Sequence, residues 1–215
     1  MNNNKISDAT YTTLQAKYGK YGSWALWQRP AAGQKLHAVD CGIDSFAPQL
    51  ADAAFRQTHL TSVGVALALN WSDRGPCSDD DWANFHDITA HSQDYKAAKM
   101  LLDTPFEGSY MTDAIKNFPE TKATTALKEI TKPENADKFA ASAAMLQEEL
   151  DLIQPQYLII FGRSAEELVK IMVQRGVLNL GDIKCEEIDH YANMLSYEKI
   201  AAIAERLRQL PLDFI

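Results

Sequence analysis

The sequence predicts an α/β fold: a three-layer α/β/α sandwich with a central four-stranded parallel sheet. Segments 63–69 and 157–161 are apolar, uncharged and without alternation, which is typical of strands covered by helices on both faces. Helical patterns separate the strand-like segments, and that order favours right-handed crossovers and parallel strands. Since no repeat or domain boundary is visible, we expect one α/β domain spanning 1–215, with 1–60 as an N-terminal helical extension packed on a core of 61–215.

Each element follows from a local pattern. The first strand is followed by a long polar loop from Asn70 to Asp94, and the longest helix opens at Pro133 and ends before Pro155. Segment 48–55 also reads as a helix with Pro48 at its start, and a short helix is expected to end at Gly19 or Gly22. The expected strands are 62–69, 108–115, 156–161 and 182–188, and the other expected helices are 94–102, 133–153, 165–174 and 197–210.

Composition narrows the possible functions. The formal net charge of −8 argues against non-specific coating of nucleic acid, which needs many lysines and arginines. No apolar run reaches the roughly 18 residues of a membrane helix, and residues 1–10 lack a secretory apolar segment. The three separated cysteines form no Cys-x-x-Cys pair, so we expect a reduced, cytoplasmic protein without a structural metal or cofactor.

Several common motifs are absent. No Gly-x-Gly-x-x-Gly, Gly-Lys-Ser/Thr or Gly-x-Ser-x-Gly occurs in the sequence. The turn at Gly162 has a single glycine, which favours tight packing over a phosphate cradle. His86, Asp87, His91 and Asp94 lack the spacing of helical zinc sites, so we expect loop and capping roles for them.

Polar residues do gather at the predicted ends of strands. Asn70 ends the first strand, Tyr110 and Asp113 are expected to end the second, and His190 follows the fourth. A parallel sheet brings such residues to one edge, where ligands of open α/β sheets bind. An amide, a carboxylate, an imidazole and aromatics such as Trp71 could hold a planar polar ring. The alternative for Asn70 is a turn or cap.

Four segments, covering about residues 60–210, resemble the uracil-DNA glycosylase superfamily. VGVALALNWS at 63–72 is similar to the family's first motif, and GSYMTDAIKN at 108–117 is similar to its second strand. LDLIQPQYLIIFGRSAEEL at 150–168 is similar to its helix–Pro–strand–Gly–Arg–helix segment, and HYANML at 190–195 occupies the place of its last motif. The resemblance implies the family's fold, DNA repair by base flipping, and hydrolysis of an N-glycosidic bond.

The resemblance also implies residue roles. Asn70 would position the attacking water, and His190 would stabilise charge on the departing base. Phe85 would stack on the flipped base, Asp113 would read its Watson–Crick edge, and Met194 or Leu195 would fill the gap left in the duplex. Trp71 and Tyr110 complete the expected substrate-binding set. Because an ionised carboxylate only accepts hydrogen bonds, Asp113 in place of the family's usual Asn predicts a base that is not simply uracil.

Two functions remain open from the sequence. The first is a hydrolase that acts on a base or nucleotide in DNA, in RNA or free in solution. The second is a non-catalytic nucleotide- or protein-binding module of the same fold, in which the loop from Asn70 to Asp94 would be the recognition surface. An unrelated α/β hydrolase would require a catalytic triad that the sequence does not indicate.

Overall fold

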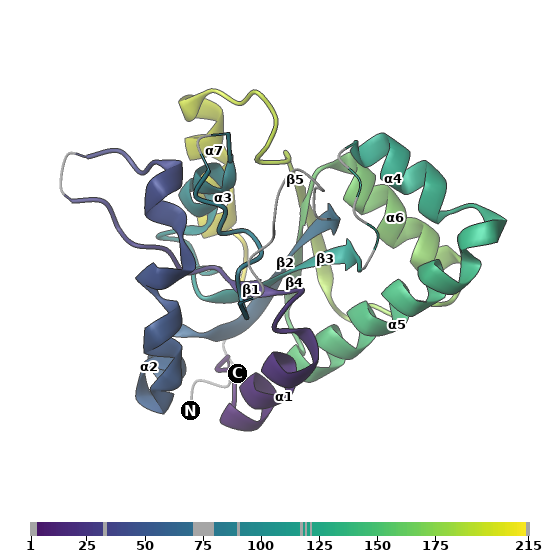
Figure 1. The fold of residues 1–215 in the computed structure, drawn as a ribbon, viewed down its shortest axis with the longest axis horizontal. Coiled ribbons are helices and arrows are strands. Elements are labelled where there is room, and N and C mark those ends of the chain that lie inside the picture. The colour runs from purple at the N-terminus through teal and green to yellow at the C-terminus, as the bar shows by residue number, and fades with distance from the viewer. Residues whose placement is uncertain are drawn as a thin grey trace.

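The computed structural model describes residues 4–31, 34–70, 80–89, 91–116, 118, 120 and 122–213. Its centre is a five-stranded sheet in the order β1-β3-β2-β4-β5 (Figure 1). The four long strands are mutually parallel, and β1 pairs with β3 in the antiparallel direction. The strands are β1 (Ser23–Trp24), β2 (Thr61–Asn70), β3 (Ser109–Ile115), β4 (Tyr157–Phe161) and β5 (Lys184–Ile188).

The predicted α/β class is confirmed, but the predicted count of four strands is wrong. The extra strand β1 consists of two residues, too few to show periodicity in the sequence. It comes from the N-terminal 60 residues, so this segment contributes to the sheet in addition to packing on it. Trp24 of β1 is fully buried, and Lys5 forms an isolated bridge with Thr61 at the start of β2.

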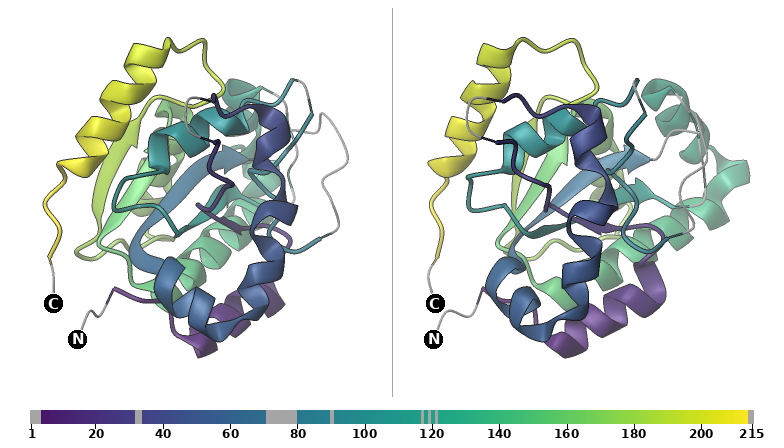
Figure 2. Two further views of the ribbon diagram at one scale, coloured as in Figure 1. Left: turned by 90° about the vertical axis from the view of Figure 1, so that its left-hand side faces the viewer. Right: turned by 60° about the vertical axis from the view of Figure 1, so that its left-hand side comes forward.

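Helices cover both faces of the sheet. One face is covered by α1 (Asp8–Tyr18), α4 (Ala123–Ile130), α5 (Ala136–Ile153) and α6 (Arg163–Gln174). The other face is covered by α3 (Asp94–Leu101) and α7 (Tyr197–Arg208), seen in front of the sheet in Figure 2. Beside them, α2 (Ala53–His59) follows the short 3-10 turns η1 (Ala38–Cys41), η2 (Ile43–Ser45) and η3 (Ala47–Ala51). The turn η4 (Pro133–Asn135) leads into α5.

The helices on both faces of the sheet explain the unbroken apolar run of β2. Val65, Leu67 and Leu69 belong to the hydrophobic cluster under α5 and α6, whereas Ala66 and Ala68 belong to the cluster under α3 and α7. Successive side chains of a strand point to opposite faces, so both sets must be apolar. The α3 and α7 side is lined by the smaller residues of this strand.

The predicted helices agree with the structure apart from their ends. The helix predicted from Pro133 is divided into η4 and α5. α5 ends at Ile153, and its C-cap Gln154 has a left-handed backbone with φ of 52° just before Pro155. Segment 48–55 is divided between η3 and α2, with Pro48 at the start of η3. The helix α4 was not predicted. None of the helices within the described ranges is both long and apolar enough to cross a membrane.

Candidate functional site

The candidate site lies near the carboxyl ends of the parallel strands. Ala68 of β2 is in register with Asp113 of β3, and Phe161 of β4 is in register with Ile188 of β5. Because Leu67 pairs with Ile160, the residues Ala68 and Phe161 are the next neighbours across β2 and β4. These neighbours form a row across four strands, on the face covered by α3 and α7. The strand row consists of Asp113, Ala68, Phe161 and Ile188.

Asp113 is a buried carboxylate with one fixed oxygen. Its side chain is 4% exposed, and Asn84 donates a hydrogen bond from Nδ2 to Oδ2 at 2.8 Å. In the described part of the chain, no residue donates a hydrogen bond to Oδ1, and no cation forms an ion pair with it. Burial raises the pKa of this carboxyl to about 6, while the bond from Asn84 lowers it by less. Asp113 therefore presents one acceptor oxygen that a ligand could use.

Asn84 has no amide hydrogen left for a ligand. Its Nδ2 donates both to Asp113 and, at 2.8 Å, to the main-chain oxygen of Tyr21. Its Oδ1 accepts the N–H of Phe85 at 3.1 Å. Asn84 is thus a positioning residue that orients the Asp113 carboxylate and the backbone of Phe85.

The backbone around Asn84 is strained. Trp82 and Phe85 both have positive φ, 69° and 65°, a conformation that costs a non-glycine residue about 1–2 kcal/mol. Trp82 is held by hydrogen bonds of 2.7 Å from its N–H to the Gly19 oxygen and from Ser23 Oγ to its own oxygen. Strain that is maintained by surrounding contacts is frequent at functional sites. Here it places Asn84 against Asp113 and buries Phe85.

Aromatic rings surround the end of the strand row. Tyr191 stacks on His190 with ring centroids 4.5 Å apart, and it contacts Phe161 edge-on at 5.2 Å. Phe85, which is 5% exposed, lies edge-on to Tyr191 at 6.4 Å. The predicted stacking residue Phe85 and the predicted His190 therefore meet in one aromatic group, joined by Tyr191.

His190 is fixed as a hydrogen-bond donor. The main-chain N–H of Ala192 donates to its Nδ1 at 3.1 Å, so the neutral ring carries its proton on Nε2. Burial lowers the pKa of the imidazole to about 4, which keeps the ring neutral near pH 7. Its position depends on Gly162, whose φ is 84° and where a Cβ atom would lie 3.0 Å from the Cβ of His190. The single glycine of the β4–α6 turn thus makes room for His190.

Asn70 has contacts of a different kind. Its Nδ2 donates to the main-chain oxygen of Glu120 at 2.9 Å and, more weakly, to that of Phe118 at 3.4 Å. It pairs in the sheet with Ile115, two residues beyond the row that contains Asp113. These bonds tie the end of β2 to the segment after β3, and the water-positioning role of Asn70 stays a prediction.

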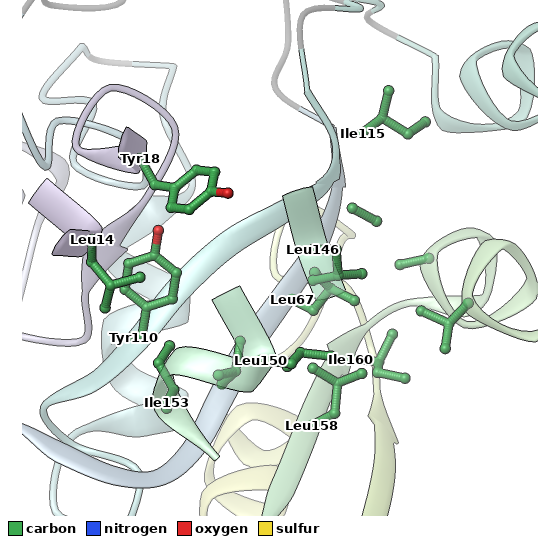
Figure 3. Packing of buried hydrophobic residues seen from close by; sticks show 14 of the residues in the cluster. Leu14, Tyr18, Leu67, Tyr110, Ile115, Leu146, Leu150, Ile153, Leu158 and Ile160 are labelled. Carbon is green, nitrogen blue, oxygen red and sulfur yellow. The ribbon is translucent and has the colours of Figure 1, made fainter. Parts of the chain in front are cut away.

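Tyr110 is not brought to this group. It is fully buried on the opposite face, where its hydroxyl donates to Glu149 Oε1 of α5 at 2.9 Å and its ring lies near Leu14 and Tyr18 of α1 (Figure 3). Tyr110 and Asp113 are three positions apart in one strand, so their side chains point to opposite faces. Tyr110 therefore packs in the core, and strand parity alone could have indicated this.

The remaining predicted residues are distributed around the edge. Met194 is fully exposed in the loop after His190, and Leu195 packs against the cluster under α3 and α7. Trp71 lies outside the described residues. The exposure of Met194 is compatible with its predicted insertion into a duplex, which stays a prediction.

A second carboxylate, Asp94, lies close to the same group. It begins α3 and accepts the N–H of Asp87 at 2.9 Å through Oδ2. Burial raises the pKa of the Asp94 carboxyl to about 6. Burial first, and then the charges of Asp94 and Asp113, raise the pKa of the Tyr191 phenol. Within the described ranges, no group of three or more His, Cys, Asp or Glu residues is arranged to hold a metal ion.

Four members of this group were not predicted from the sequence: Asn84, Asp94, Phe161 and Tyr191. Two of them are direct neighbours of predicted residues in the sequence, Asn84 of Phe85 and Tyr191 of His190. Asp94 was considered only as a metal ligand or a cap. No protein-family model matches this chain, and no curated protein matches its sequence.

Proposed function

We propose that this protein binds a nucleobase at the carboxyl edge of its sheet and hydrolyses the N-glycosidic bond of that base, in the manner of a divergent uracil-DNA glycosylase. The observation that carries the proposal is the buried Asp113 carboxylate, which Asn84 orients while one oxygen stays open. Phe85 follows Asn84 in the sequence, and the donor His190 follows β5 at the same edge of the sheet. Recognition of a planar polar ring needs an oriented polar edge and aromatic contacts together.

Base recognition falls to Asp113 and Phe85. The open Oδ1 accepts an N–H of the base edge, and the ring of Phe85 supplies an aromatic contact. Because Asn84 holds the carboxylate before the ligand arrives, little ordering of Asp113 accompanies binding. Tyr191 and Phe161 extend the apolar surroundings.

His190 supports the departure of the base. The bond between C1′ and the base nitrogen breaks, and its electron pair stays with the base. The neutral His190 donates from Nε2 to the oxygen on which charge builds, an electrostatic role. A water oxygen then bonds to C1′, and the water's proton is transferred to the base directly or through solvent. Asn70 is the candidate for orienting this water.

The test is release of the free base from single- and double-stranded oligonucleotides by the full-length chain. The panel contains uracil, hypoxanthine, mismatched thymine and methylated bases. We expect release of at least one base, and a fall in its rate of about 100-fold or more in His190→Ala. His59→Ala, an exposed histidine of α2, is the matched control and keeps the wild-type rate. Intact glycosidic bonds throughout the panel would contradict the proposal.

A binding module of the same fold is the second candidate. It is favoured by the contacts of Asn70, whose amide nitrogen bonds to two main-chain oxygens of the chain itself. In that case a nucleotide would raise the melting temperature without turnover, with about 2.7 kcal/mol of stabilisation at a ligand concentration of 100 times Kd. The loop from Asn70 to Asp94, in its described part, would form the recognition surface.

A further inference from the structure

The nucleobase proposal leaves open which base the site accepts, and two carboxylates bear on this choice. Asp113 is buried, and its Oδ1 accepts no hydrogen bond from a described residue. Asp94 lies near enough for its charge to act on both Asp113 and Tyr191. Neither carboxylate forms an ion pair with a described residue. A buried carboxylate without an ion-pair partner attracts a ligand that brings donors and positive charge.

Lys116, the lysine whose charge acts on Asp113, is paired with another carboxylate, and the buried Lys96 of α3 donates to the main-chain oxygen of Asn193 at 3.0 Å. Lys116 forms a buried ion pair with Glu149 at 2.8 Å, on the face of the sheet covered by α5. Its Nζ also donates to Thr112 Oγ1 at 2.8 Å and to the main-chain oxygen of Asp113. Lys116 therefore stabilises the end of β3 from the α5 face of the sheet and forms no ion pair with the carboxylate of Asp113.

The aromatic side chains favour the same kind of ligand. Phe85 follows Asn84, the hydrogen-bond partner of Asp113, and Tyr191 contacts both Phe85 and Phe161 edge-on. The face of an aromatic ring attracts a cation through its quadrupole. Carboxylates beside aromatic rings form a common arrangement for cationic groups. Uracil, by contrast, is neutral, and its polar edge has a single N–H between two carbonyl oxygens, which an ionised carboxylate repels.

We propose that the preferred base carries positive charge on its ring, as an N-alkylated nucleobase does, and that Asp113 determines this specificity. This inference rests on the proposed function. When the glycosidic bond of such a base breaks, the electron pair neutralises the ring charge, so the base departs neutral. Water adds to C1′ and releases its proton to solvent. The reaction then depends less on stabilising an anion than the release of uracil does.

The inference is tested by binding, independently of turnover. The full-length protein is titrated at pH 6 with two nucleosides that differ by one methyl group and one charge, 7-methylguanosine and guanosine. We expect wild type to bind 7-methylguanosine at least about tenfold more tightly, and Asp113→Asn to lose this preference. Asp182→Asn, an exposed aspartate before β5, changes the net charge equally and should keep the preference.

The outcomes separate the two proposals. Equal affinities for the two nucleosides, a preference that survives in Asp113→Asn, or no binding of either nucleoside would overturn the specificity for a cationic base. Release of uracil from DNA by the wild type with no preference for 7-methylguanosine would leave the glycosylase proposal in place and remove this inference alone. Charge-selective binding without release of any base would support the inference for a binding module and contradict the hydrolase.

Discussion

The buried carboxylate of Asp113 gives a prediction for stability. Burial raises the pKa of this group from 3.8 to about 6 in the folded protein. Between about pH 4 and pH 6 the folded state therefore binds more protons than the unfolded chain, and the free energy of unfolding falls as the pH rises. At 1.36 kcal/mol for each pKa unit, the Asp113 contribution changes by about 3 kcal/mol in all, of which about 2 kcal/mol falls between pH 4 and pH 6.

Replacing Asp113 with Asn removes the titration and keeps the shape of the side chain. We expect the free energy of unfolding of Asp113→Asn, relative to that of the wild type, to rise by about 2–3 kcal/mol between pH 4 and pH 8. Other shifted groups are common to both proteins and cancel in the comparison. The raised pKa of Asp94 lowers the free energy of unfolding as the pH rises, as that of Asp113 does. Burial lowers the pKa of His86 and His190 to about 4, so these two histidines increase the free energy of unfolding as the pH rises.

The assay is urea unfolding at five pH values from 4 to 8, followed by the fluorescence of the tryptophans, of which Trp24, Trp27 and Trp82 are buried. Equal m-values for the two proteins would show that the denatured states are comparable. The exposed Asp182→Asn variant is the control and should show no such change with pH. A difference between Asp113→Asn and wild type that stays constant within about 1 kcal/mol from pH 4 to 8 would refute the reasoning.

Two further predictions concern the frame of the site. Gly162→Ala should lower the rate of base release at least tenfold more than Gly176→Ala. Both glycines have positive φ, 84° and 69°, so both substitutions strain the backbone. Only at Gly162 would the added Cβ atom lie against His190, whereas open space surrounds Gly176. The melting temperatures of the two variants, followed by circular dichroism, would show whether backbone strain destabilises both equally. Equal rates of base release in the two variants would contradict the positioning of His190 by Gly162. Lys116→Met should destabilise the fold by about 3–5 kcal/mol, because it leaves Glu149 buried without its cation. An unfolding free energy within about 1 kcal/mol of wild type would contradict this assignment.

The sequence was most informative where burial on both faces left an unbroken apolar run. β2 and β4 were predictable for this reason, and their parallel pairing followed from the helices between them. β1 was not predictable, because two residues carry no periodicity and its pairing with β3 depends on tertiary contacts. The helix α4 was also missed, although Ala126 and Ile130 lie four positions apart and are both buried.

The site was only partly predictable. Strand ends correctly indicated that Asp113 and His190 lie at the same edge of the sheet, since parallel strands share their carboxyl ends. The contact between Asn84 and Asp113 was not predictable, because it depends on the left-handed backbone of Trp82 and Phe85. No sequence rule marks a non-glycine residue for that conformation.

The most direct test of the central claim is a crystal structure of the protein with a bound nucleoside, for which 7-methylguanosine is the first choice. The account predicts that the base donates an N–H to Oδ1 of Asp113 and contacts the ring of Phe85, with His190 on the side of the glycosidic bond. A nucleoside bound away from the carboxyl edge of the sheet, with the Asp113 carboxylate still unpartnered at Oδ1, would contradict the account.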